Sequence, residues 1–204
     1  MRRILGICSL ATIAEPRVRY GMPAHQMPHQ EWNADMVRAL PDDGSRYELI
    51  DGALLVSPAP SWSHQRAVRT LLIAFQSYCE QHKLGEALAS PADIELSPKD
   101  VVQPDVFVVP RISSSWAEVR SLLLAVEVLS PSSIYNDRFV KRPRFQRERV
   151  PEFWMVDQDT RVFERWRPDD KEPEVIADVM TWQPLPHIPA MSIPLGEFFD
   201  KANR

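Results

Sequence analysis

Glycine and cysteine are scarce in this chain, and long hydrophobic runs are missing. Six glycines and two cysteines occur among 204 residues, whereas proline occurs 19 times. Cys8 and Cys79 lie far apart and have no neighbouring cysteine or histidine, which argues against a disulfide framework or a zinc ribbon and fits a reducing cytoplasm. No window approaches the roughly 20 apolar residues of a bilayer-crossing helix, so we expect no membrane partner.

Basic residues are outnumbered as well. The chain has 24 Lys and Arg against 28 Asp and Glu, a formal net charge of -4. The molecule as a whole therefore does not attract nucleic acid, and any such contact must use a local basic patch. A glycine-rich phosphate loop, a Gly-x-Ser-x-Gly nucleophile elbow and a paired-cysteine site are absent from the sequence, which argues against a kinase, a serine hydrolase and a zinc enzyme.

The composition predicts one domain. Hydrophobic side chains make up 44% of the residues, which is enough for a full core. We expect residues 1–21 to be a poorly ordered extension and residues 22–204 to form a single domain. The opening Met1-Arg2-Arg3 and the apolar residues after it follow the order of a signal peptide, but a clean cleavage site is lacking, and we expect a cytoplasmic location.

The spacing of apolar residues predicts a mixture of helices and strands. Recurrence every three to four residues predicts helices over 31–40, from Ser61 or Ser63 to about Lys83, and over 137–149. Strands are expected at 92–96, 101–109, 122–129, 152–156, 161–167 and 175–179, and a hairpin over 47–56 with its turn at Asp51-Gly52. Strands outnumber helices, yet a long helix must cover a sheet face, so the fold class is α+β or α/β with a mixed sheet.

Two carboxylates stand in the apolar surroundings of central strands. Glu127 is the only polar residue within 122–129, and burying it ionised without a partner would cost several kcal/mol. Asp105 stands near the start of the apolar run 101–109. A loop containing residues 112–117 is long enough to let the two strands lie side by side, where both acids could bind Mg²⁺ or Mn²⁺. A buried ion pair is the structural alternative for Glu127, and a strand-opening Pro-Asp dipeptide is the alternative for Asp105.

Residues 137–149 form a locally basic segment with a net charge of +4. Its basic residues are Arg138, Lys141, Arg142, Arg144, Arg147 and Arg149, and its acidic residues are Asp137 and Glu148. We expect Arg138, Arg142 and Arg144 to contact a DNA phosphate backbone, and Lys141 to reach toward the two acids and a scissile phosphate. A solvated basic helix face would explain the same residues without any ligand.

Glu48 and His64 are further candidates. Glu48 lies on the predicted hairpin and could supply a third carboxylate to the cation, or could be a solvent-facing strand residue. His64 could polarise a water or touch a phosphate, or could make a routine hydrogen bond near the start of its helix. His25 and His29 lie in a proline-containing segment, and we assign them no role.

These residues together resemble a known family. The matching pieces are Tyr47 to Gly52, His64, Pro104-Asp105, Leu124 to Pro131, Asp137 with Lys141, and Val150 to Asp157. Over roughly residues 46–157 the chain resembles the bacterial Uma-type restriction endonucleases of the PD-(D/E)XK nuclease superfamily. The resemblance implies a restriction-endonuclease-like core with a mixed sheet flanked by helices. It also implies Mg²⁺ or Mn²⁺ held by Asp105 and Glu127, with Lys141 as the lysine near the attacked phosphate.

The chain departs from that pattern at three positions. Leu129 stands where the superfamily lysine usually follows the acid, so Lys141 must reach the site from the next helix. Pro143 lies inside that helix and is expected to kink or restart it near Lys141. Arg149 stands where the family tends to have glycine before Val-Pro-Glu, so we expect a turn of different shape.

The sequence therefore favours a metal-dependent endonuclease that hydrolyses DNA phosphodiester bonds. Cutting both strands of double-stranded DNA calls for two such centres, which predicts a homodimer. A catalytically inactive nuclease-fold module for DNA binding or protein assembly is the alternative, and Leu129 and Pro143 favour it. A nuclease directed at RNA would use the same chemistry.

Overall fold

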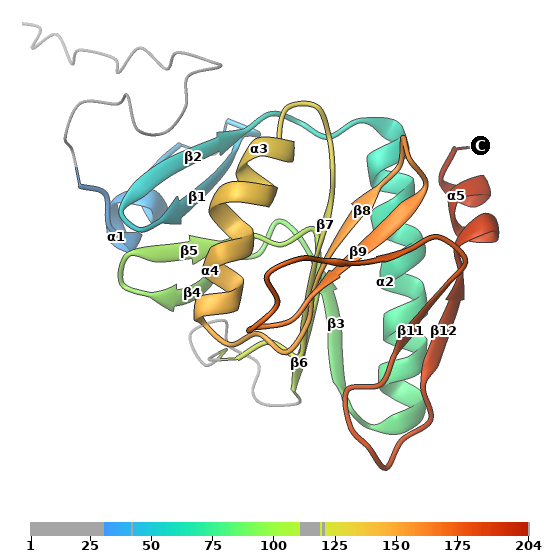
Figure 1. Ribbon diagram of the computed structural model, residues 1–204. Helices are drawn as coiled ribbons and strands as arrows, with labels where there is room; N and C mark the ends of the chain where they lie inside the picture. The colour runs from blue at the N-terminus through green and yellow to red at the C-terminus, as the bar shows by residue number, and fades with distance from the viewer. Residues whose placement is uncertain (1–30, 42, 111–118, 120, 204) are drawn as a thin grey trace, which may run out of the picture.

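The computed structural model describes residues 31–41, 43–110, 119 and 121–203 (Figure 1). The expected extension at residues 1–21 and the expected loop at 112–117 lie outside these ranges, as do His25 and His29. Within the described ranges, no helix has the length and apolar character needed to cross a membrane.

A six-stranded mixed sheet forms the centre of the fold (Figure 1). Its strands, in spatial order, are β10 (Glu174–Ile176), β9 (Val162–Trp166), β8 (Phe153–Asp157), β7 (Leu124–Val128), β6 (Val106–Pro110) and β3 (Gly85–Ala89). The pair β7 and β8 is parallel, and the other neighbouring pairs are antiparallel. The helical segment between β7 and β8 supplies the crossover that a parallel pair requires. The expected mixed sheet is thus confirmed.

Helices cover both faces of this sheet (Figure 1). On one face, α2 (Trp62–His82) and α5 (Leu195–Asn203) share an apolar core with alternate residues of β6, β7 and β8. On the other face, Phe145 of α4 (Arg142–Arg147) stacks on Phe153 with ring centroids 4.8 Å apart. The predicted helix from residue 61 to 83 is confirmed, with Ser61 as its N-cap and Lys83 in the left-handed conformation at its end.

A second, four-stranded sheet packs beside the first and carries the predicted hairpin. Its strands, in spatial order, are β2 (Ala53–Ser57), β1 (Arg46–Ile50), β5 (Asp100–Val102) and β4 (Ile94–Ser97). The hairpin turn is made by Asp51 and Gly52, with φ angles of 51° and 78°, which is the positive φ that a tight two-residue turn requires. The short helix α1 (Ala34–Arg38), predicted over 31–40, lies against β1.

The expectation of one strand over residues 101–109 is wrong. The run is divided at Gln103-Pro104-Asp105 into β5, which belongs to the four-stranded sheet, and β6, which belongs to the six-stranded sheet. Pro104 has no N–H to donate to a ladder, so the chain leaves one sheet here and enters the other. Asp105 therefore lies at the junction of the two sheets.

Several other elements differ from the sequence expectation. Strand β3 was not predicted, because its residues Gly85-Glu86-Ala87-Leu88-Ala89 have low strand propensity and pairing with β6 decides their conformation. The expected strand at 175–179 ends at Ile176, and residues from Val179 onward begin a separate two-stranded sheet. That sheet consists of β11 (Val179–Trp182) and β12 (Met191–Pro194). Neither β12 nor α5 was predicted.

The predicted helix over 137–149 is confirmed in position but has three parts. It begins as α3 (Ile134–Asn136), widens into the single π-helical turn η3 (Asp137–Lys141) and continues as α4. In the π turn the N–H of Arg142 donates to the carbonyl of Asp137, five residues earlier. The helix restarts directly after Lys141, as the position of Pro143 predicts.

Candidate active site

Asp105 is held by three donors at the junction between the sheets, where it is 3% exposed. Its Oδ2 accepts a hydrogen bond of 2.8 Å from the Val128 N–H and lies 3.0 Å from His64 Nε2. Its Oδ1 accepts a hydrogen bond of 2.5 Å from Arg46 Nη1. Burial opposes ionisation, but His64 and Arg46 outweigh it and hold the pKa of Asp105 below its ordinary value. Asp105 is therefore a buried, ionised carboxylate.

Glu127 lies on the neighbouring strand and is 1% exposed. Val106 of β6 pairs with Val126 of β7, so Asp105 and Glu127 are the next residues along the two strands. The expectation that the strands carrying the two acids lie side by side is confirmed. Burial raises the pKa of Glu127 well above its ordinary value, and the negative charge of Asp105 adds to this effect although Lys141 opposes it.

Lys141 lies among Glu127 and two further carboxylates and is itself 2% exposed. Its Nζ lies 2.7 Å from Glu48 Oε2, 3.0 Å from Glu127 Oε1 and 3.6 Å from Asp137 Oδ1. Burial disfavours the ammonium, but these carboxylates outweigh burial and raise the pKa of Lys141. Glu48 is 0% exposed and its Oε1 accepts the Gln103 N–H, so the solvent-facing alternative for Glu48 is wrong.

Two members of the site were given no role from the sequence, although Asp137 belongs to the pieces that carry the family resemblance. Arg46 precedes Glu48 by two residues on β1, a spacing that places both side chains on one face of the strand. Asp137 precedes Lys141 by four residues, the spacing of neighbours on one helix face. These two spacings are the signals that could have identified them. Burial raises the pKa of Asp137 to about 6.

The site contains more negative than positive groups. Four buried carboxyl groups face one arginine, one lysine and one histidine, so the formal charges of the acids exceed those of the arginine and the lysine by two. The carboxylates are Glu48, Asp105, Glu127 and Asp137, the cations are Arg46 and Lys141, and the histidine is His64. Carboxylate oxygens are the ligands that hard divalent cations take, and such an ion would balance the excess. The chemistry of this donor set therefore fits Mg²⁺ or Mn²⁺.

Basic side chains, rather than an open ligand triad, face these oxygens. Among the residues that the structure describes, no three His, Cys, Asp or Glu side chains are grouped as a ready metal site. Lys141 forms ion pairs with Glu48 and Glu127, and Arg46 forms one with Asp105. The buried ion pair considered for Glu127 therefore exists, with lysine as the partner.

The three arginines expected to contact DNA are engaged within the chain. Arg138 makes a two-pronged pair with Glu164, with hydrogen bonds of 2.7 and 2.6 Å. The Arg144 side chain is buried and lies 2.7 Å from Asp100 Oδ2. The Arg142 guanidinium lies over the Trp166 ring, 4.4 Å from its centroid. These contacts explain the basic helix by packing and charge pairing, and a role of these arginines toward DNA stays a prediction.

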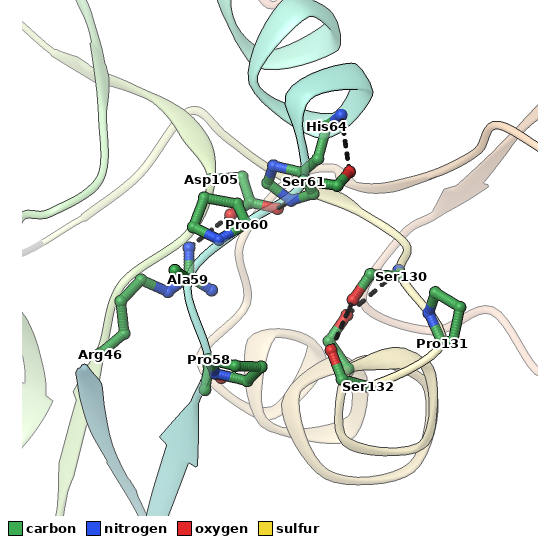
Figure 2. A pocket seen from close by; sticks show the side chains of 12 residues that line it. Arg46, Pro58, Ala59, Pro60, Ser61, His64, Asp105, Ser130, Pro131 and Ser132 are labelled. Carbon is green, nitrogen blue, oxygen red and sulfur yellow. Dashed lines mark hydrogen bonds and ion pairs between the residues drawn. The ribbon is translucent and has the colours of Figure 1, made fainter. Parts of the chain in front are cut away.

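A pocket of about 250 Å³ opens onto Asp105 (Figure 2). Its walls are the segment Ser57–Ser61, which leads from β2 into α2, and the segment Ser130–Ser133, which leads from β7 into α3. Arg46 and His64 also line it. The pocket gives a ligand a route from the surface to Asp105, the least buried of the four acids.

The fold is that of a mixed α/β protein with buried acids on neighbouring central strands. The model of the Uma2 family, described as a putative restriction endonuclease, matches residues 34–196, and the chain belongs to that family. A solved structure with a similar fold is that of a putative nuclease belonging to DUF820 from Anabaena variabilis ATCC 29413. It matches with a TM-score of 0.66 and 17% sequence identity, covering 84% of this chain and 99% of that one. No protein with a curated description matches the chain.

Proposed function

We propose that the protein is a metal-dependent endonuclease that hydrolyses phosphodiester bonds in double-stranded DNA. Membership of a family described as putative restriction endonucleases supports this function. The observation that carries it is the meeting of Asp105, Glu127 and Lys141 in one buried cluster, of which Asp105 lines a pocket open to the surface. Buried carboxylates whose pKa values are pushed in opposite directions are typical of sites that perform acid–base or metal chemistry.

Asp105 and Glu127, with Glu48 as a third ligand, would hold Mg²⁺ or Mn²⁺. When bound, a divalent cation supplies a Lewis acid that polarises a phosphate oxygen and lowers the pKa of water. The protein's own contribution is to keep Asp105 ionised through the Val128 N–H and the adjacent cations.

Lys141 supplies the positive charge that the superfamily usually places two residues after the acid. The π turn η3 and the carboxylates of Glu127 and Glu48 fix its ammonium beside the acids. There it would stabilise negative charge that develops on the attacked phosphate, a role in which loss of one preorganised donor costs about 10²-fold or more in rate. His64, beside Asp105, would contact the substrate or orient a water.

Cleavage of duplex DNA in Mg²⁺ or Mn²⁺, with EDTA as control, tests this function. The wild type should cut only with metal, and Asp105→Asn and Glu127→Gln should each lower the rate by at least about 10²-fold. Binding without any metal-dependent cleavage would instead support the alternative, an inactive nuclease-fold module. An RNA duplex of the same sequence tests the RNA-directed variant of the same chemistry.

We also propose that the nuclease acts as a homodimer, because two strands require two centres. Sedimentation equilibrium measures this directly. A mass of twice 23.4 kDa is the expected result, and a monomer at all concentrations would contradict it.

A further inference from the structure

The pocket at Asp105 is built from polar groups that suit an anion. Hydroxyl groups stand on both walls, from Ser61 on one side and from Ser130 and Ser132 on the other (Figure 2). Ser61 also caps α2, a helix of 21 residues, so the positive end of that helix dipole lies at the pocket wall. A helix end alone defines no binding site, and the buried side chains beside it provide the specific evidence.

Arg46 lines this pocket and has one donor without a partner. Its side chain is 19% exposed, and its Nη1 donates to Asp105. Its Nε is buried and has no hydrogen-bond partner among the described residues. His64 lines the same pocket, is more than nine-tenths buried, and its Nδ1 likewise has no partner there. Unsatisfied buried polar atoms are rare in folded proteins, so these two side chains have hydrogen-bonding capacity that the described residues leave unused.

Arg46 also borders a second cavity. That cavity has a volume of about 370 Å³ and includes Tyr47 and Gln103. Asp105 is the one carboxylate in the described part of the chain that forms an ion pair with Arg46. Asp105 accepts a hydrogen bond from only one of the five N–H donors of the guanidinium, so other donors remain for a second anion.

We infer that this pocket binds a phosphate group of the DNA backbone, with Arg46 as its principal donor and the Ser130–Ser133 segment as its outer wall. The planar guanidinium matches phosphate oxygens in a two-pronged geometry, which an ammonium does not reproduce. The inference rests on the proposed function, because it names the point at which the substrate enters the site. It makes Arg46 a substrate-binding residue.

Binding of a fluorescently labelled DNA duplex, measured by anisotropy in EDTA over a series of salt concentrations, tests this inference without any cleavage. Ser132→Glu places a carboxylate at the exposed rim of the pocket. Ser77→Glu adds the same charge at an exposed position on α2, where Ser77 lines a different cavity. Thermal melting of each variant verifies that it is folded.

We expect Ser132→Glu and Arg46→Met to weaken DNA binding about tenfold or more, as loss of a charge-assisted contact does. Each should also reduce the slope of log affinity against log salt by about one. Arg46→Lys keeps the positive charge but loses the planar, two-pronged guanidinium, so its DNA affinity should lie between those of wild type and Arg46→Met. The DNA affinity of Ser77→Glu should stay within about twofold of the wild-type value.

Equal binding by Ser132→Glu and Ser77→Glu would overturn the inference, as would a wild type that binds no DNA in EDTA. Weaker binding of inorganic phosphate by Ser132→Glu, with duplex binding unchanged, would also overturn it, since the pocket would then take free phosphate. These outcomes are independent of cleavage. A wild type that never cuts, but loses DNA binding through Ser132→Glu, would refute the proposed function and leave the pocket assignment standing.

Discussion

Lys141 Nζ lies 3.0 Å from Glu127 Oε1, although the two residues belong to different elements and both are almost completely buried. The ammonium reaches the acid from the helical π turn η3, which follows β7 in the chain. This relationship links the stability of the fold to the chemistry proposed for it.

Lys141→Met should destabilise the protein by about 3–5 kcal/mol, because it leaves three buried carboxylates without their shared cation. Urea unfolding in EDTA measures the change. Lys201→Met is the matched control, since Lys201 pairs with Glu197 on the exposed side of α5. Its free energy of unfolding should lie within about 0.5 kcal/mol of the wild-type value. Equal effects of the two substitutions would refute the buried cluster.

Asp137→Asn should change how stability depends on pH. The pKa of Asp137 is raised from 3.8 to about 6 in the folded protein, so the folded state binds more protons than the unfolded state between these values. Its contribution to stability is therefore greatest below pH 4 and declines as the pH rises to about 6. The variant should lack this decline and be more stable than wild type at pH 7, by about 1–3 kcal/mol.

Asp105 should behave in the opposite way, because its pKa is lowered on folding. Its stabilising contribution is present above the ordinary aspartate pKa and is lost as the pH falls below it. The two pH dependences are compared by measuring the urea midpoint of unfolding in EDTA from pH 3 to 7. The proteins measured are the wild type, Asp137→Asn and Asp105→Asn. Parallel pH profiles for both variants would contradict the assignment.

Gly85→Ala should destabilise the protein by at least about 2 kcal/mol. A Cβ at this position would lie 2.0 Å from the carbonyl oxygen of Val109 on the paired strand, and the backbone there cannot yield cheaply. Gly196→Ala is the control, because a Cβ meets nothing within 4 Å there and alanine favours a helix. Chemical denaturation measures the free energy of unfolding of both variants. A Gly85→Ala variant as stable as wild type would contradict the β3–β6 pairing.

Arg149→Gly should stabilise the protein by about 0.5–1 kcal/mol. Arg149 adopts a φ of 58°, a left-handed conformation that costs energy for any residue with a Cβ and that glycine adopts freely. Asp169→Ala serves as control, since it removes the exposed ion pair of Arg149 without changing the backbone. A melting temperature for Arg149→Gly below that of Asp169→Ala would contradict the strain.

The sequence was most informative where local chemistry conflicted with local structure. Glu127 and Asp105 are anomalous in apolar runs, and this anomaly located the buried site. The position before Val-Pro-Glu, where the family that the chain resembles tends to have glycine, has a left-handed backbone in this chain at Arg149.

The partners of these acids depend on contacts that local pattern does not encode. Arg46 reaches Asp105 across 59 positions of sequence, and β3 forms from residues with little strand propensity. The engagement of Arg138 and Arg144 with Glu164 and Asp100 follows from the same long-range packing. Composition showed a basic segment, but only the folded arrangement shows which charges are already paired.

Binding of Mn²⁺, followed by the loss of the free-ion signal in electron paramagnetic resonance, tests the central claim most directly. The wild type should bind Mn²⁺, while Asp105→Asn and Glu127→Gln should each bind it at least about tenfold more weakly, because each removes a charged oxygen ligand. Equal Mn²⁺ affinity in wild type and both variants, or no binding by any of them, would mean that the buried carboxylates serve only the ion pairs with Arg46 and Lys141.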